Sequence, residues 1–218
     1  MPVIGITGGI ATGKTAFSQA LRRALPTAAF FDADVSAREL TNGDAEVRAL
    51  ITAMFGPEIY SATGDLNRGK LRTIVFTDPE KKAALEQILH PRIRRQWALE
   101  AERRRDSTDI FLADIPLLYE TGGESLCDRV VVVACSPRVQ LDRLMSRSSL
   151  APGAAEQMIA AQMPLSEKVA RADHVVWNNG PLPVLEWQAE TLAGFWKHVA
   201  QASGLRDQRP HAGRLRSQ

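Results

Sequence analysis

The stretch "GITGGIATGKTAF", residues 5–17, decides the class of fold. Gly8 through Thr15 have the spacing G-x-x-x-x-G-K-T, which is typical of loops that bind phosphate groups. The apolar run at 3–7 predicts a buried strand before this loop, and the apolar residues at helical spacing in 16–25 predict a helix after it. A strand, a glycine-rich loop and a helix in this order are the context that the motif requires, so the sequence predicts a nucleotide-binding α/β protein.

The residues of this loop have the chemistry that phosphate binding needs. Gly8 and Gly13 permit backbone angles that a Cβ atom forbids, so the loop amides can point at one centre. The N-terminus of the following helix adds positive potential. Lys14 adds a charge for the outer phosphates, and Thr15 offers a hydroxyl to Mg²⁺. The alternative is a simple glycine-rich turn, but a turn does not require Lys and Thr directly after its second glycine.

Composition is that of an ordinary globular protein. The 218 residues suffice for one large domain or a core with insertions, and 44% of them are hydrophobic and 24% charged. Apolar runs stay below the ~18 residues of a membrane span, and the chain enters its first strand directly, so we expect no membrane segment and no signal peptide. Cys127 and Cys135 indicate neither a disulfide framework nor a metal site, which favours a cytoplasmic protein.

The net charge of +2 depends on the C-terminal tail at 204–218. The tail contains four Arg and one Asp, so it contributes +3 and the rest of the chain carries −1. A basic surface for nucleic acid is therefore not indicated. Because the tail also contains Pro, Gly and few apolar residues, we expect it to be disordered, with a basic interaction arm as the alternative.

Strand and helix patterns alternate along the rest of the chain. Short apolar runs rich in β-branched or aromatic residues predict four further strands, at 28–32, 109–114, 129–135 and 174–177. Ser136 and Pro137 predict the start of one helix, and another helical pattern covers about 184–202. This alternation predicts an α/β fold with a parallel five-stranded sheet flanked by helices on both faces. Three tryptophans at helical spacing are expected in the core: Trp97, Trp187 and Trp196.

Two segments are longer than this alternation needs. Residues 36–108 exceed a crossover and are mostly helical in pattern, so they predict an insertion above the carboxyl edge of the sheet, where ligands bind in open α/β folds. We expect this insertion to bind the second substrate. Residues 138–170 contain several arginines and predict a lid that closes over the transferring phosphate and excludes water. The nucleotide-binding core then consists of 1–35, 109–137 and 171–203.

Two carboxylates end the second predicted strand. Asp32 and Asp34 point to the same side if the strand continues, because the side-chain period is two. One of them can order the Mg²⁺ shell and the other can take the proton of an attacking hydroxyl. The alternative is a helix cap, with Asp34 or Ser36 as the capping residue. Asp114, at the end of another predicted strand, is a second candidate for the metal shell.

Eight segments along the chain form a characteristic series: "GITGGIATGKT" at the start, "DAD" at 32–34, "GDLNRGKLRTIVF" at 64–76, "LHPRI" at 89–93, "IPLLYE" at 115–120, "QLDRLMSR" at 140–147, "AAQMPLSEKVARAD" at 160–173 and "NNG" at 178–180. Many families share the loop, whereas "HPRI" combined with "PLLYE" and "QMPLSEK" is far more specific. With these segments in this order, the chain resembles the dephospho-CoA kinase family over about residues 2–200.

The resemblance implies a P-loop kinase core, a helical CoA-binding insertion and a lid. It implies transfer of the ATP γ-phosphate, with Mg²⁺, to the ribose 3′-hydroxyl of dephospho-CoA, which gives coenzyme A and ADP in the last step of coenzyme A biosynthesis. It implies ATP and dephospho-CoA as the partners, and no nucleic acid, membrane or obligate protein partner.

The resemblance also implies roles for individual residues. Asp34 is the implied base and Lys14 meets the phosphate charge, with Asp32 and Thr15 on the metal side. The residues implied around the ATP phosphates are Gly8, Gly9, Ile10, Ala11, Thr12, Gly13, Lys14, Thr15 and Ala16. The residues implied around dephospho-CoA are Asp34, Arg68, His90, Pro91 and Tyr119. The resemblance implies that two lid arginines, Arg143 and Arg147, approach the ATP phosphates and that Arg143 is also catalytic. It implies that Asn178 and Gly180 lie near the adenine.

Some residues depart from the pattern of the family. Ala11 and Thr12 stand where the family usually has Gly-Ser, and Trp177 replaces a smaller residue before Asn178. His90 matches the family but can also simply end a helix before Pro91.

Two other classes of protein share the phosphate loop. One is another small-molecule P-loop kinase, although the length of the 36–108 segment argues against the smallest such kinases. The other is a non-enzymatic ATP-binding regulator, which would need neither the acceptor carboxylates nor the arginines of the lid. A GTPase is not indicated, because the motif N-K-x-D is absent from the sequence.

Overall fold

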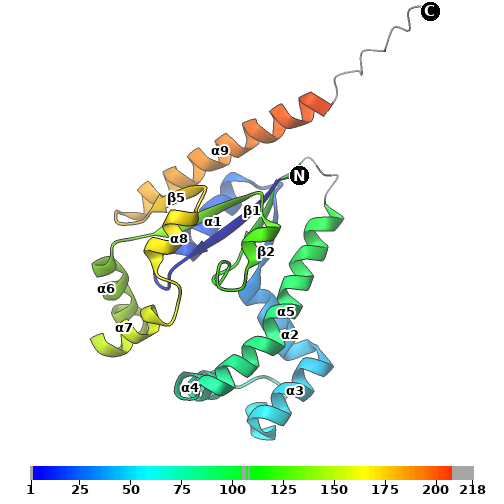
Figure 1. Ribbon diagram of the computed structural model, residues 1–218, viewed down its shortest axis with the longest axis vertical. Coiled ribbons are helices and arrows are strands. Elements are labelled where there is room, and N and C mark those ends of the chain that lie inside the picture. Colours follow the sequence, from blue (N-terminus) through cyan, green and yellow to red (C-terminus); the bar gives the residue numbers. More distant parts are fainter. Residues whose placement is uncertain (1, 105–106, 108, 208–218) are drawn as a thin grey trace, which may run out of the picture.

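Five parallel strands form one sheet over the residues that this computed structural model describes, which are 2–104, 107 and 109–207. The strand order is β2-β3-β1-β4-β5, so the strand that leads into the phosphate loop lies at the centre (Figure 1). The bounds are β1 Val3–Gly8, β2 Ala29–Asp32, β3 Phe111–Asp114, β4 Arg129–Ala134 and β5 His174–Trp177. This architecture confirms the α/β fold class predicted from the sequence.

The register aligns the carboxyl ends of the strands. Asp32 pairs with Asp114, Asp114 pairs with Ile6, and Gly8 pairs with Val133. The residues that follow these ends are therefore brought to one edge of the sheet, where open α/β folds bind their ligands. The helices are α1 Lys14–Ala24, α2 Ala33–Gly43, α3 Ala45–Phe55, α4 Arg68–Thr77, α5 Pro79–Arg103, α6 Pro137–Ser148, α7 Pro152–Ala160, α8 Leu165–Arg171 and α9 Leu182–Asp207, with short 3₁₀ turns η1 Pro57–Ile59 and η2 Gly123–Leu126.

Alternating side chains of the strands build a core on each face of the sheet. On one face, Ile6 and Val133 pack with residues of α1 and α9, including Leu21 and Trp196. On the other face, Val132 and its neighbours pack with α5 and α8. Period-two alternation in strands covered on both sides explains why their sequences are continuously apolar.

The insertion between β2 and β3 has a core of its own. Buried side chains from α2, α3, η1, the segment between η1 and α4, α4 and α5 form this cluster: Leu40, Val47, Ile51, Ile59, Leu66, Leu71 and Ile88. The long helix α5 connects it to the sheet, because Trp97 near its other end is only 2% exposed and packs in the sheet core. The insertion therefore extends past the sheet on a rigid helix, as Figure 1 shows for α3, α4 and one end of α5.

The predicted lid at 138–170 consists of three helices with different surroundings. Figure 1 shows α6 and α7 projecting from the sheet, whereas α8 lies against it. Helix α8 packs on β4, and its Lys168 is completely buried. Within the predicted lid, α6 and α7 therefore pack on each other away from the sheet, and α8 packs on it.

The C-terminal helix differs from its sequence-based description. It continues to Asp207, so residues 204–207 of the predicted tail are helical, while 208–218 lie outside the described residues. Trp97 and Trp196 are buried as predicted, but Trp187 is 64% exposed and the prediction for it was wrong. The buried stripe of α9 runs through Leu185, Ala189 and Ala193, and Trp187 lies outside it. Among the described residues, we find no helix of sufficient length and apolarity to span a membrane.

Candidate active site

The glycine-rich loop lines a pocket of about 730 Å³ at the carboxyl edge of the sheet. Side chains from α2, α6 and the segments after β3 and α7 complete its walls. The lining residues are Gly8, Gly9, Ile10, Ala11, Gly13, Lys14, Thr15, Ala16, Asp34, Pro116, Asp142, Arg143, Ser146, Arg147 and Gln162. Eight of the nine predicted phosphate residues are among them, and the ninth, Thr12, is fully buried with its hydroxyl donating to the Gly9 carbonyl at 2.9 Å.

Close packing explains both glycines that begin and end the motif. A Cβ atom on Gly8 would lie 2.5 Å from the carbonyl oxygen of Val133 on the neighbouring strand. Gly13 has a φ angle of 97° and serves as the N-cap of α1, a left-handed conformation that suits glycine. The loop amides and the N-terminus of α1 therefore meet at the pocket, which is the arrangement that binds phosphate.

Ala11 also has a left-handed conformation, with a φ angle of 60°. A residue with a Cβ atom is strained there by about 1 kcal/mol or more. We expect Ala11→Gly to raise the free energy of unfolding by about 0.5–1 kcal/mol, measured by urea denaturation. Ala20→Gly inside α1 is the control and should lower it by about 1 kcal/mol. A loss of stability in Ala11→Gly would contradict the strained conformation.

Three side chains from outside the motif hold the loop in shape. Gln162 accepts a hydrogen bond from the Ile10 N–H at 2.8 Å, and Gln140 donates to the Ile10 carbonyl at 2.8 Å. Asn178 donates to the Thr12 carbonyl at 2.9 Å. Gln140 stands on α6 and Gln162 follows α7, so two segments of the predicted lid form hydrogen bonds with the same loop residue, Ile10.

Lys14 makes an ion pair with Asp114, which is 4% exposed and ends β3. The second oxygen of Asp114 accepts a hydrogen bond from Ser18 at 2.6 Å. Asp114 therefore orients the lysine at the edge of the pocket and keeps its charge inside the site. Its carboxylate oxygens are occupied by these two residues, which gives Asp114 a supporting role in addition to the metal role considered from the sequence.

The two aspartates after β2 differ in a way that the strand period did not predict. The strand ends at Asp32 and α2 begins at Ala33, so side chains no longer alternate by two. Asp32 is the N-cap of α2: its Oδ1 accepts the N–H groups of Asp34 and Val35 at 3.0 and 3.1 Å. The alternative considered from the sequence, in which Asp34 or Ser36 caps this helix, was wrong.

Asp34 points to the site and Asp32 does not. Asp34 in the first turn of α2 lines the phosphate pocket, whereas Asp32 lines a groove between α1, α2 and α5. The structure therefore brings only one of the two carboxylates to Lys14 and Thr15. The predicted metal role of Asp32 is not supported by this position.

A second pocket, of about 200 Å³, lies beside the first and under the insertion. Its walls are mainly apolar and come from α2, α5 and the segment after β3: Ala33, Asp34, Ala37, Leu85, Glu86, Leu89, His90, Ile93, Arg94, Trp97, Ile115, Pro116, Leu117 and Thr121. Arg94 holds two of these walls together by donating to the carbonyl oxygens of Thr121 at 2.9 Å and Gly122 at 2.8 Å. Asp34 and Pro116 line both pockets, so they stand at the junction.

The residues expected around dephospho-CoA are only partly brought together. His90 lines the second pocket. Its alternative role as a helix end was wrong, because α5 continues through the exposed Pro91 to Arg103. Arg68 is the first residue of α4 and donates to the Thr41 hydroxyl at 3.3 Å, away from either pocket.

Tyr119 is not brought to the substrate pockets. It is 5% exposed, and the guanidinium of Arg171 stacks on its ring at 4.3 Å. Burial raises the pKa of Tyr119 to about 12, so its hydroxyl is neutral at physiological pH. Within the described part of the chain this hydroxyl has no hydrogen-bond partner. The predicted substrate contact of Tyr119 therefore requires a rearrangement that would expose it.

The lid arginines do face the phosphate pocket. Arg143 and Arg147 stand one turn apart on α6 and both line it. Arg143 donates to the carbonyl of Asn178 at 2.9 Å, which fixes it beside the loop. Asn178 is 8% exposed and connects the loop to the end of β5, while Gly180 is exposed two residues further on.

The oxygen donors at the phosphate pocket suit a metal that binds mainly through phosphates. Across the described residues we find no cluster of three or more His, Cys, Asp or Glu side chains that could hold an ion. The Thr15 hydroxyl nevertheless lines the pocket directly after Lys14. Mg²⁺ typically binds through one or two protein oxygens together with substrate phosphates, so this donor set fits Mg²⁺.

Comparison with known proteins identifies the family. A family model described as dephospho-CoA kinase matches residues 2–183. The chain belongs to the dephospho-CoA kinase family. A dephospho-CoA kinase of Bacillus cereus is 40% identical over 199 residues, which cover 90% of this chain and 98% of that relative. One of Symbiobacterium thermophilum is 41% identical and covers 94% of this chain and 84% of its own length.

Solved structures share the fold of this chain. A crystal structure from Thermus thermophilus has a TM-score of 0.68 at 34% identity and covers 91% of this chain and 97% of its own. A dephospho-CoA kinase from Campylobacter jejuni also has a TM-score of 0.68; it covers 92% of this chain and 98% of its own, and at 22% identity it supports the fold. The family resemblance predicted from the quoted segments is therefore confirmed.

Sequence reasoning missed several residues of the site. Gln140, Gln162, Arg94, Pro116 and Lys168 received no role, although four of them lie inside segments that carried the resemblance. The pattern identifies such segments as characteristic of dephospho-CoA kinases. It does not reveal which side chain reaches the loop, because Gln140, Gln162 and Lys168 each lie 130 or more positions from the loop residue that they contact.

Proposed function

We propose that Asp34 is the general base of this ATP-dependent kinase, which phosphorylates the 3′-hydroxyl of dephospho-CoA to give coenzyme A in the last step of coenzyme A biosynthesis. The ATP phosphates occupy the pocket at the glycine-rich loop. Dephospho-CoA enters from the side of the insertion, with its ribose at the junction of the two pockets. Asp34 accepts the hydroxyl proton as the oxygen attacks the γ-phosphorus, and ADP leaves.

The shared position of Asp34 is the observation that carries this proposal. A base must reach the acceptor hydroxyl while that hydroxyl faces the γ-phosphoryl group. Asp34 lines both the phosphate pocket and the pocket under the insertion. Its carboxylate is not needed as a helix cap, since Asp32 caps α2. The family relatives named dephospho-CoA kinase support the choice of acceptor.

The cations of the site meet the charge that develops during transfer. Lys14 and the loop amides stabilise the phosphates, and Arg143 and Arg147 approach from the lid. Because Arg147 is exposed and Arg143 is partly buried against Asn178, water screens Arg147 more strongly. The two arginines therefore contribute unequally.

We expect Arg143→Ala to lower kcat by about 10²-fold and Arg147→Ala by about 10-fold, since each removes positive charge that counts most in the transition state. The dissociation constant of dephospho-CoA should change less than kcat in both variants. The measurements are steady-state kinetics and calorimetric titration with dephospho-CoA. If a variant changes only acceptor affinity, its arginine belongs to the acceptor site instead.

Mg²⁺ bound to the ATP phosphates and to Thr15 would supply further charge neutralisation at the transferring group. Thr15→Val removes the hydroxyl with little change of shape. We expect it to raise the Mg²⁺ concentration needed for half-maximal turnover by about 10-fold, measured by titrating Mg²⁺ at constant ATP. Thr12→Val is the control, because the Thr12 hydroxyl donates to the Gly9 carbonyl inside the loop. An equal rise in the Mg²⁺ requirement of Thr12→Val would contradict the proposed binding of Mg²⁺ by Thr15.

A coupled assay of ADP formation tests the proposed function as a whole. The acceptors compared are dephospho-CoA, adenosine, AMP, shikimate and gluconate, each at several concentrations. We expect the largest kcat/KM for dephospho-CoA and negligible ADP release without an acceptor. A larger kcat/KM for any other acceptor would overturn the proposal, and ADP release that ignores the acceptor would favour a simple nucleotide hydrolase.

A further inference from the structure

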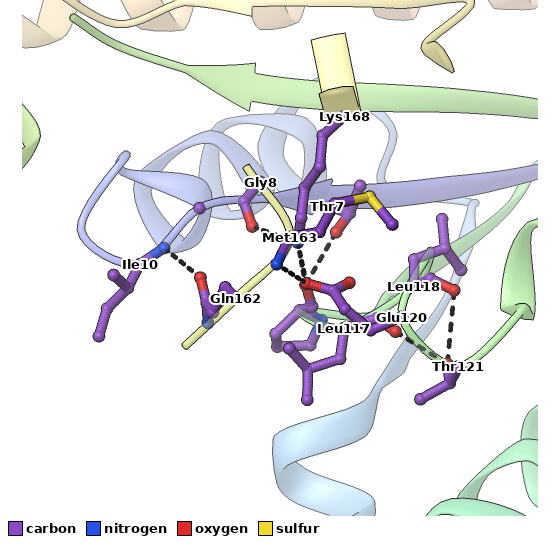
Figure 2. Close-up of polar contacts among 12 residues, drawn as sticks. Thr7, Gly8, Ile10, Leu117, Leu118, Glu120, Thr121, Gln162, Met163 and Lys168 are labelled. Carbon is purple, nitrogen blue, oxygen red and sulfur yellow. Dashed lines mark hydrogen bonds and ion pairs between the residues drawn. The ribbon is translucent and has the colours of Figure 1, made fainter. Parts of the chain in front are cut away.

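Lys168 on α8 is fully buried, whereas lysine side chains are rarely buried unless they are paired. Figure 2 shows its side chain extending toward Gly8 and Glu120. The Nζ atom lies 2.8 Å from Oε1 of Glu120. It also donates to the carbonyl oxygens of Gly8 at 3.3 Å and Pro116 at 3.2 Å. An ammonium group has three N–H donors, so these three acceptors satisfy it.

Packing alone does not require a charge at this position. The surrounding core includes the apolar side chains of Met163, Leu165 and Val169. Moving an ammonium group out of water is costly, and apolar side chains in place of a whole buried ion pair such as Lys168 and Glu120 often give equal or greater stability. The presence of lysine is better explained by the three groups that it holds in place.

Two of these groups belong to the walls of the candidate active site. Gly8 ends β1, begins the phosphate loop and lines the phosphate pocket. Pro116 lines both pockets, and its carbonyl also accepts a hydrogen bond from the Thr7 hydroxyl at 2.9 Å. The Lys168 ammonium group therefore connects Gly8 of the phosphate pocket to Pro116, which lies in the wall between the phosphate pocket and the pocket under the insertion.

The third group connects the same cation to the lid. Oε1 of Glu120 also accepts the Met163 N–H at 3.1 Å (Figure 2). Met163 is adjacent to Gln162, which accepts the Ile10 N–H of the phosphate loop at 2.8 Å. The segment between α7 and α8 is thus held beside the loop by two adjacent residues. Gln162 contacts the loop itself, and Met163 contacts Glu120.

We infer that Lys168 is a positioning residue for phosphoryl transfer: it sets the start of the phosphate loop, Pro116 and the segment between α7 and α8 relative to one another. Because Lys168 is inaccessible to solvent, it acts through these neighbours and not on either substrate. The inference rests on the proposed transfer between the two pockets. Small errors in alignment are costly in such reactions, since a shift of about 1 Å can lower the rate about 10²-fold.

Lys168→Met tests this role, because methionine fills similar space and has no N–H donors. We expect kcat to fall by about 10–100-fold, with the best acceptor of the panel above. The dissociation constants for ADP and for that acceptor should change by less than about 3-fold, since the groups that contact the substrates remain. Kinetics are measured well below the melting temperature, and calorimetry gives both dissociation constants.

Trp196→Leu is the matched control for a loss of stability. Trp196 is 3% exposed and packs between α9 and the opposite face of the sheet, so its variant should melt earlier with kcat unchanged. The inference would be overturned if Lys168→Met had the kcat of the wild type, or if its kcat fell no more than that of Trp196→Leu. A loss that appears only in the two dissociation constants would also overturn it, because that result assigns Lys168 to binding.

If Lys168→Met does not fold, Lys168→Arg is used to test the same positioning role. Arginine retains the charge opposite Glu120, but its planar guanidinium cannot direct donors to three acceptors around one nitrogen. We expect a folded variant with kcat lowered about 10-fold or more, and full activity would overturn the inference. Failure of the proposed function is seen separately, as a wild-type preference for another acceptor.

Discussion

Asp34→Asn is expected to lower kcat by about 10²–10⁴-fold while the protein remains folded and binds ADP normally. Asparagine keeps the shape of the side chain but cannot accept the proton of the attacking hydroxyl. Because the phosphoryl transition state is loose, the lower end of this range applies if little proton transfer has occurred when the bond to phosphorus forms. The measurements are kcat, the ADP dissociation constant and the melting temperature of wild type and variant.

The neighbouring carboxylate provides the control for this experiment. Asp32 accepts two backbone N–H groups at the start of α2, so Asp32→Ala should lower the free energy of unfolding by about 0.5–2 kcal/mol. Its kcat should fall far less than that of Asp34→Asn. If Asp34→Asn turns over normally while Asp32→Ala loses activity at full stability, the assignment of the base must be exchanged between them.

Local patterns predicted most of the fold. The strand before the phosphate loop, the loop itself and the helix after it follow from adjacent residues, and β5 has the predicted bounds of 174–177. Ser136 is the N-cap of α6 and Pro137 its first residue, as capping preferences indicate. These features could be predicted because the interactions that determine them lie within a few positions of one another.

The capping role of Asp32 could not be predicted in the same way. Period-two alternation applies only while a strand continues, and the sequence "FFDADVSA" does not state where β2 ends. With the strand ending at Asp32, that residue becomes the cap and Asp34 turns to the pockets. The position of this boundary thus makes Asp32 the helix cap, whereas the choice of Asp34 as the candidate base is the one that the resemblance had already implied.

Partners far apart in the chain were also beyond sequence reasoning. Gln162 meets Ile10, and Lys168 meets Gly8, each across more than 150 positions. Trp187 shows the same limit on α9, because helical spacing alone does not say which stripe of a helix faces the sheet. Tyr119 belongs to a characteristic segment but is buried under Arg171, so resemblance did not reveal its surroundings.

Lys14→Ala is expected to lower kcat by at least about 10²–10³-fold, because its charge is no longer available to the phosphates as the γ-phosphoryl group moves. The same change leaves the Asp114 carboxylate buried, and Ser18 is then its remaining side-chain partner among the residues that the structure describes. Removing one member of a buried ion pair typically costs about 3–5 kcal/mol, so this variant should also melt at a lower temperature. Activity must therefore be measured where the variant is fully folded.

A double variant separates these two consequences. Adding Asp114→Asn to Lys14→Ala removes the unpaired carboxylate charge and keeps an oxygen that can accept the Ser18 hydroxyl. We expect the melting temperature to recover most of its loss while kcat stays as low as in Lys14→Ala. Recovery of both quantities would mean that Lys14 acts through stability alone, and the phosphate loop would then lose its catalytic cation. Recovery of stability without activity is the expected result, because Asp114 is paired with Lys14, and of these two residues it is Lys14 that lines the phosphate pocket.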